Sequence, residues 1–160
     1  MNIDRIDWHY DDAEQLYTDT HEVTGEFTEE QYREIELKAC NHIGLFIRWI
    51  MDNHFEGHGE EITPAACEKV RKGEISGAEY LLDYCDGKFW DVDVCSEIMP
   101  FVEDYYVNSG RFFRDYGESC GSEGGEDMPC YSFISGDGDY SRLKERIDMA
   151  YKKFCEENNG

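Results

Sequence analysis

Two histidines, His54 and His58, stand four residues apart, and Glu61 follows shortly after them. Imidazoles one helical turn apart can share a metal ion, and a nearby carboxylate can act on metal-bound water. The order differs from the zincin motif, in which glutamate directly follows the first histidine. Gly57 and Gly59 also indicate that the helix has ended there. We therefore favour solvated loop histidines, and keep a metal-dependent hydrolase using His54, His58 and Glu61 as the alternative.

A second candidate metal site is a calcium loop near the C-terminus. Asp137, Asp139 and Ser141 alternate as calcium ligands do. An EF-hand loop would then need glycine and glutamate where this chain has Arg142 and Asp148. Capping of a helix by Asp139 or Ser141 explains the same residues more simply.

His42 is the remaining candidate for acid–base chemistry, because imidazole titrates near neutral pH. The alternative is a structural histidine of the core, bonded to a backbone carbonyl. No serine or cysteine stands in the context of an activated nucleophile, and the seven cysteines include no Cys-x-x-Cys pair. We expect no catalytic residue, no metal and no cofactor.

The net charge is the strongest chemical signal in the chain. Its 37 acidic and 15 basic residues give a formal net charge of -22. Such a chain repels phosphate, so nucleic-acid binding is not expected, and no apolar run is long enough to span a membrane. Solubility of a small domain needs a net charge of only about 2–8. The excess favours capture of a basic protein partner, because complementary fields accelerate encounter.

Acidic and aromatic residues stand together beside predicted turns, where they would be available to such a partner. We predict that the contact residues are Trp90, Asp91, Asp93, Asp115, Tyr116 and Glu118. Aromatic anchors supply dry contact area, and the acids supply the field. This role involves no covalent chemistry. An adaptor that binds a basic peptide is a further alternative.

Helices must position these residues, because apolar side chains recur mostly at three- and four-residue steps. Thr28 and Gln31 form a capping box that opens a long helix ending between residues 52 and 55. The second half of this helix is apolar on all sides, so we expect it to be buried at the centre of the fold. Gly44 within it indicates the close approach of another element.

Shorter helices are predicted after this central one. Thr63 and Pro64 mark a helix start, and Ser76 with Glu79 forms a second capping box. Pro100 implies a kink or a late helix start near residue 99. Ser141 opens a last helix.

The sequence predicts a mainly α protein, a compact single-domain helical bundle over residues 1–160. Residues 1–27 are expected to form an extended, aromatic-bearing arm, and residues 28–157 the helical body. Residues 117–128 are rich in glycine and acids and predict a loop. We expect at most one or two short strands, and residues 130–134 are the one convincing strand-like run.

Several short motifs resemble a bacterial family of uncharacterised small cytoplasmic proteins, in the same order over residues 5–155. They are Trp8-His9-Tyr10, His42-Ile43-Gly44 with Trp49, Gly77 followed by Leu81–Lys88, Phe101 with Tyr105-Tyr106, and Asp115-Tyr116. Such proteins are similar to immunity proteins of polymorphic toxin systems. The resemblance implies a cytoplasmic protein that neutralises a cognate basic toxin domain by covering its active site. It implies no catalytic residue and leaves the oligomeric state open.

Overall fold

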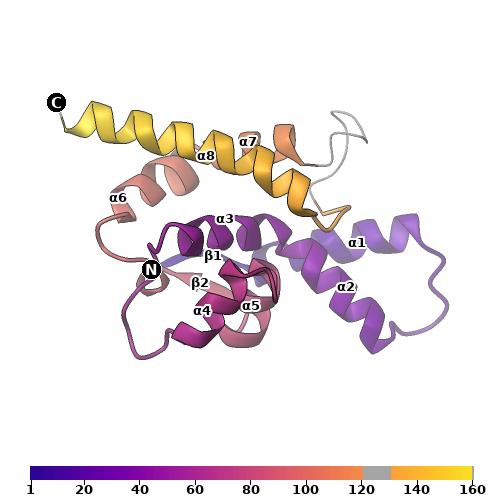
Figure 1. The fold of residues 1–160 in the computed structure, drawn as a ribbon. Helices are drawn as coiled ribbons and strands as arrows, with labels where there is room; N and C mark the ends of the chain where they lie inside the picture. The colour runs from indigo at the N-terminus through magenta and orange to yellow at the C-terminus, as the bar shows by residue number, and fades with distance from the viewer. Residues whose placement is uncertain (121–130, 160) are drawn as a thin grey trace.

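The computed structural model describes residues 1–120 and 131–159, and helices make up most of this part of the chain (Figure 1). In chain order the elements are β1 (Asn2–Arg5), η1 (Ile6–Trp8), α1 (Tyr10–Thr20), α2 (Glu29–Ala39), α3 (Asn41–Asp52), α4 (Pro64–Arg71), α5 (Gly77–Tyr84), β2 (Lys88–Trp90), η2 (Asp91–Asp93), α6 (Met99–Val102), η3 (Glu103–Asn108), α7 (Arg111–Ser119) and α8 (Asp137–Asn158). The segments η1 and η2 are short 3₁₀ turns, and η3 is π-helical. The strands β1 and β2 pair antiparallel, with Arg5 opposite Lys88. The predicted mainly α fold with two short strands is confirmed.

Helix α3 is the centre of the molecule, as predicted. Ten of its twelve residues are buried, and Arg48 and Asp52 are the exceptions. Figure 1 shows α8 lying over one side of α3, and α4 and α5 over the other. The apolar side chains of α3 join a core that is rich in aromatic rings packed against one another. The centre of the Phe46 ring, for example, lies 4.9 Å from that of the Tyr106 ring and 5.1 Å from that of the Phe112 ring.

The predicted helix starts are largely correct, and one predicted helix is divided. Both capping boxes are formed: Thr28 accepts from the Gln31 amide, and Ser76 accepts from that of Glu79. Pro64 is the first residue of α4, and α6 begins late, at Met99. The long central helix is two helices, because the backbone leaves helical geometry at Cys40.

The glycine within α3 has the role that its position predicted. A Cβ on Gly44 would lie 2.2 Å from the backbone nitrogen of Ala78, and a Cβ on Gly77 would lie 1.8 Å from the Gly44 carbonyl oxygen. Helices α3 and α5 therefore cross with their backbones in contact. Only glycine on both sides permits this approach.

The expected extended arm is wrong, because residues 1–27 contain a strand, a 3₁₀ turn and an eleven-residue helix. The acids that indicated an arm include Asp11 and Asp12, which lie in the first turn of α1. Carboxylates are favourable there because they face the positive end of the helix dipole. Ala13 and Tyr17, one turn apart, are buried against α2.

Two further predictions fall partly outside the described residues. Of the predicted acidic loop 117–128, residues 117–119 belong to α7, residue 120 follows this helix, and residues 121–128 are not described. Of the strand-like run, Tyr131–Ile134 forms no strand, and Cys130 is not described. The last helix starts at Asp137 rather than Ser141, because the Asp139 carboxylate accepts from the Gly136 amide.

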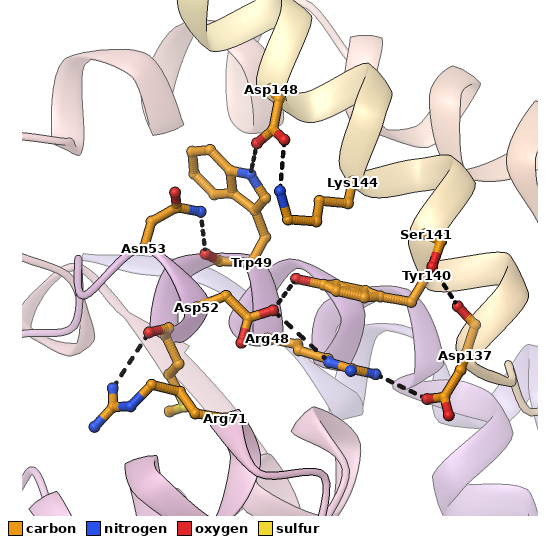
Figure 2. A network of polar contacts seen from close by, with 11 residues as sticks. Arg48, Trp49, Asp52, Asn53, Arg71, Asp137, Tyr140, Ser141, Lys144 and Asp148 are labelled. Atoms are coloured by element: carbon orange, nitrogen blue, oxygen red, sulfur yellow. Dashed lines mark hydrogen bonds and ion pairs between the residues drawn. The ribbon is translucent and has the colours of Figure 1, made fainter.

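Polar contacts attach α8 to α3 over the aromatic core (Figure 2). The Trp49 indole nitrogen donates to Asp148 at 2.8 Å, and the Tyr140 hydroxyl donates to Asp52 at 2.5 Å. The Arg48 guanidinium lies 4.0 Å from the centre of the Tyr140 ring. These contacts orient α8 so that its apolar side faces α3.

None of the described helices combines the length and the apolar character that crossing a bilayer demands.

Candidate functional site

A hollow of about 340 Å³ opens beside β2 and η2, where the first group of predicted contact residues lies. Trp90 and Tyr84 supply aromatic surface to it and are 38% and 43% exposed. Val92, at the centre of η2, is 50% exposed. Large apolar groups this open to water, gathered in one hollow, are typical of a contact surface.

Three carboxylates line the same hollow: Glu61, Asp86 and Asp93. Among the described residues that line it, the single cation is Lys88, whose ammonium group lies 3.6 Å from Asp86. Asp93 accepts a hydrogen bond from the Trp90 amide at 2.7 Å. Burial raises the pKa of Asp93, and the charge of Glu61 raises that pKa further, against the lowering effect of the Trp90 amide. The hollow is therefore an acidic site with too few cations of its own.

Asp91, the third predicted contact residue of this region, lies outside the hollow's lining. Its carboxylate pairs with the amino terminus of Met1 at 3.1 Å. This pair attaches the start of the chain to η2, so Asp91 is already engaged within the molecule. The hollow thus contains Trp90 and Asp93 of the predicted set, with Tyr84, Val92 and Glu61 added by the fold.

The second predicted contact group is mostly part of the core. Tyr116 is 1% exposed and its hydroxyl accepts from Asn41 at 2.9 Å, while Asp115 accepts from the Tyr105 hydroxyl at 2.7 Å. The prediction that Asp115 and Tyr116 contact a partner is corrected by this burial. Glu118 is exposed but forms an ion pair with Arg146 of α8. The face of α7 on which each residue lies, rather than its nearness to a turn, decides whether it is buried or exposed.

The alternative metal site at His54, His58 and Glu61 is not assembled. His54 follows α3 in a left-handed conformation, with φ of 56°, and His58 is exposed on the next loop. Within residues 1–120 and 131–159, the group of three potential metal ligands that come within 4.8 Å of one another is Asp4, His9 and His42. The loop histidines and Glu61 belong to no such group.

The cluster of Asp4, His9 and His42 lies where the N-terminal segment meets α3. His9 Nε2 is 2.6 Å from Asp4 Oδ1, and His42 Nε2 is 3.3 Å from Asp4 Oδ2. The hydroxyl of Tyr106 donates to Asp4 Oδ2 at 2.7 Å, and Tyr131 lies 2.6 Å from His9 Nδ1. The two imidazole rings meet edge to face, with centroids 4.4 Å apart.

Burial and neighbouring groups shift the pKa values of two members of this cluster, Asp4 and His42. Burial would raise the pKa of Asp4, but the close imidazoles of His42 and His9 outweigh this effect and hold that pKa well below its usual range. Burial lowers the pKa of His42, which is 1% exposed, against the opposing effect of Asp4. Asp4 is therefore an anion and His42 is neutral near pH 7. A deprotonated carboxylate beside a neutral imidazole can bind a cation.

His42 is thus a buried histidine, as one of the two sequence interpretations held, but none of the described residues offers it a carbonyl partner. Neither of its ring nitrogens forms a hydrogen bond with any described residue. The sequence did not reveal the cluster, because its members come from β1, the start of α1 and α3. The motifs Trp8-His9-Tyr10 and His42-Ile43-Gly44 each contain one of the two histidines, but nothing in their spacing indicates that they meet.

The molecule is a mainly helical domain with a buried ionisable cluster and an acidic surface hollow. The chain belongs to the family described as "Domain of unknown function (DUF7832)", whose model matches residues 2–129. Both the hollow and all three residues of the cluster lie within the matched residues, whereas α8 lies outside them. No curated protein and no solved structure matches the chain.

Proposed function

We propose that this chain is a non-enzymatic acidic binding protein, and specifically an immunity protein that neutralises a cognate basic toxin domain by covering its active site. The observation that supports this most is the hollow beside β2, in which exposed Trp90 and Tyr84 stand among Glu61, Asp86 and Asp93. The resemblance noted in the sequence favours the same role, in a bacterial cytoplasm.

The charge in the hollow suits a lysine or arginine side chain of the partner. Desolvation and neighbouring acids make the ionised form of Asp93 unfavourable in the free protein. An incoming cation would relieve this cost, and the aromatic rings would pack on its aliphatic stem or guanidinium plane. The net charge of -22 would meanwhile accelerate encounter with a basic surface.

The test is titration of this protein against the purified product of the adjacent gene, by calorimetry and by kinetics at low and high salt. We expect tight binding whose association rate falls as salt rises, because long-range attraction is screened. Trp90→Ala should weaken binding by about 2 kcal/mol, or about 30-fold, as an anchor residue does. Glu61→Lys should slow association.

Two variants on α8 are matched controls for these changes. Met149→Ala removes an apolar side chain that is 71% exposed, and Glu145→Lys reverses an exposed charge, both away from the hollow. Both should bind as the wild type does. Absence of binding at low salt would refute the immunity role, and equal losses at α8 and in the hollow would refute this contact surface.

An adaptor for a basic peptide is the remaining alternative, and the hollow suits it as well. An oligolysine peptide would then bind with an affinity close to that for any natural partner. For an immunity protein, the folded toxin domain should bind far more tightly than the peptide, because it covers more surface.

A further inference from the structure

The buried cluster below the N-terminal segment has no part in the proposed binding role. Asp4, His9 and His42 supply one carboxylate oxygen and two imidazole nitrogens within 4.8 Å of one another. From this donor set we propose that the three residues bind one divalent transition-metal ion of the zinc class. The ion would hold β1 and the start of α1 against α3.

The distance between two of the donors matches the distance that such an ion requires. Donors at about 2.0–2.1 Å from a tetrahedral zinc ion lie about 3.3 Å from one another. His42 Nε2 and Asp4 Oδ2 are already 3.3 Å apart. His9 Nε2 lies 2.6 Å from the other oxygen of this carboxylate, Oδ1, so the His9 ring or the carboxylate must turn as the ion enters. Side-chain rotation of His9, the most exposed of the three at 14%, can supply that movement.

Polar groups outside the donor set already orient two of the ligands. The hydroxyl of Tyr106 donates to Asp4 Oδ2, and the Arg5 amide donates to Asp4 Oδ1 at 2.8 Å. On the far side of the His9 ring, Nδ1 lies 2.6 Å from the Tyr131 hydroxyl. Histidine ligands of metals commonly bond through the second ring nitrogen in this way, which fixes the tautomer that presents Nε2 to the metal.

His42 supplies the independent observation that points to a ligand. Its ring is 1% exposed, and neither nitrogen has a hydrogen-bond partner among the described residues. Leaving a buried polar group unpaired costs about 1–3 kcal/mol, so native structures rarely do it without a reason. A metal ion on Nε2 would satisfy this atom, which faces Asp4 but has no hydrogen-bond geometry to it.

The contending interpretation is a metal-free cluster held by hydrogen bonds around Asp4. In that case His9 and Tyr106 satisfy the carboxylate, and His42 serves only as an aromatic ring packed against Phe113 and Tyr116. The two interpretations differ in whether the folded chain takes up one ion. Only the metal-bound interpretation requires His9 and His42 for this uptake.

The test uses the full chain, stripped of metal by chelation and then titrated with Zn²⁺ by calorimetry and with Co²⁺ by absorption. We expect one Zn²⁺ per chain, and visible d–d bands of bound Co²⁺ without a thiolate charge-transfer band, since the site contains no cysteine. The apparent melting temperature should rise with free Zn²⁺, because the ion binds the folded state. His42→Gln and His9→Gln should each lower Zn²⁺ affinity by about 100-fold or more, exceeding the effect of losing an outer partner.

His54→Gln with His58→Gln is the matched control, since both histidines are exposed and belong to no ligand group. This double variant should retain wild-type uptake. Tyr106→Phe keeps all three donors and should lower the affinity for Zn²⁺ by about 10-fold. This variant still tests the site if a histidine variant fails to fold. No stoichiometric uptake, a thiolate band, or uptake unchanged in both His42→Gln and His9→Gln would overturn the proposal. The binding function would be unaffected by any of these results.

Discussion

At the scale of the residue, the raised pKa of Asp93 links the electrostatics of the hollow to the pH dependence of the free energy of unfolding. Its pKa is raised chiefly by burial and further by the charges of Glu61 and Asp91. The folded protein therefore holds the Asp93 proton at a pH where the unfolded chain has released it. By linkage, this group lowers the free energy of unfolding as pH rises above the ordinary aspartate value of about 3.9.

Asp93→Asn should remove this pH dependence, since the amide oxygen can still accept from the Trp90 amide but cannot ionise. We expect the variant to match the wild type near pH 4 and to be the more stable protein near about pH 7. Urea unfolding at a series of pH values measures the difference. Glu97→Gln, at an exposed carboxylate, is the control and should show no such trend. A constant difference between Asp93→Asn and wild type at every pH would contradict this account.

The predicted contact residues show why the sequence identified only part of the candidate site. Trp90 and Asp93 were recognised because an acidic, aromatic turn is a local pattern that survives folding. Asp115 and Tyr116 show the same local pattern, yet they are buried, because α7 turns that face toward the core. Burial of an acid depends on partners such as Tyr105, which short-range sequence does not reveal.

At the scale of the element, the crossing of α3 and α5 depends on two glycines. In an isolated helix, Gly44→Ala would be stabilising by about 1 kcal/mol, because alanine has the higher helix propensity. In this fold the added Cβ would meet the Ala78 backbone at 2.2 Å, so the helices must separate. We expect a net loss of about 1–3 kcal/mol in the free energy of unfolding, as for other overpacked cores.

Gly117→Ala in α7 is the matched control for this change. A Cβ on Gly117 would meet no described atom within 4 Å, so this variant should gain up to about 1 kcal/mol. Urea unfolding of both variants measures the contrast. Gly44→Ala as stable as Gly117→Ala would mean that the two helices do not pack as closely as described.

Elements were predicted well where their signals are local. Capping boxes at Thr28 and Ser76 depend on side chains three residues apart, and both formed. The break at Cys40 and the helix of residues 10–20 were missed, since both are decided by packing between α1, α2 and α3. The cluster of Asp4, His9 and His42 was missed for the same reason, because only the tertiary fold brings its three segments together.

At the scale of the whole molecule, the two sites share the β1–β2 ribbon. Asp4 of β1 points into the core at 3% exposure, and it is paired with Phe89, the buried residue beside Trp90. The ribbon therefore carries the proposed metal ligand on its inner side and the proposed partner anchor at its open end. The net negative charge of the chain acts on the fold as a whole, and its effect on stability can be measured.

The net charge of -22 should make stability rise with ionic strength. Like charges repel most in the compact state, and NaCl shortens their range from about 30 Å at 0.01 M to about 8 Å at 0.15 M. The exposed ion pairs oppose this trend weakly, because each contributes only about 0–1 kcal/mol. We therefore expect the free energy of unfolding in urea, an uncharged denaturant, to increase over that range of NaCl. Equal effects of NaCl and KCl would identify screening as the cause, whereas stability that falls with salt would mean that the ion pairs outweigh the repulsion.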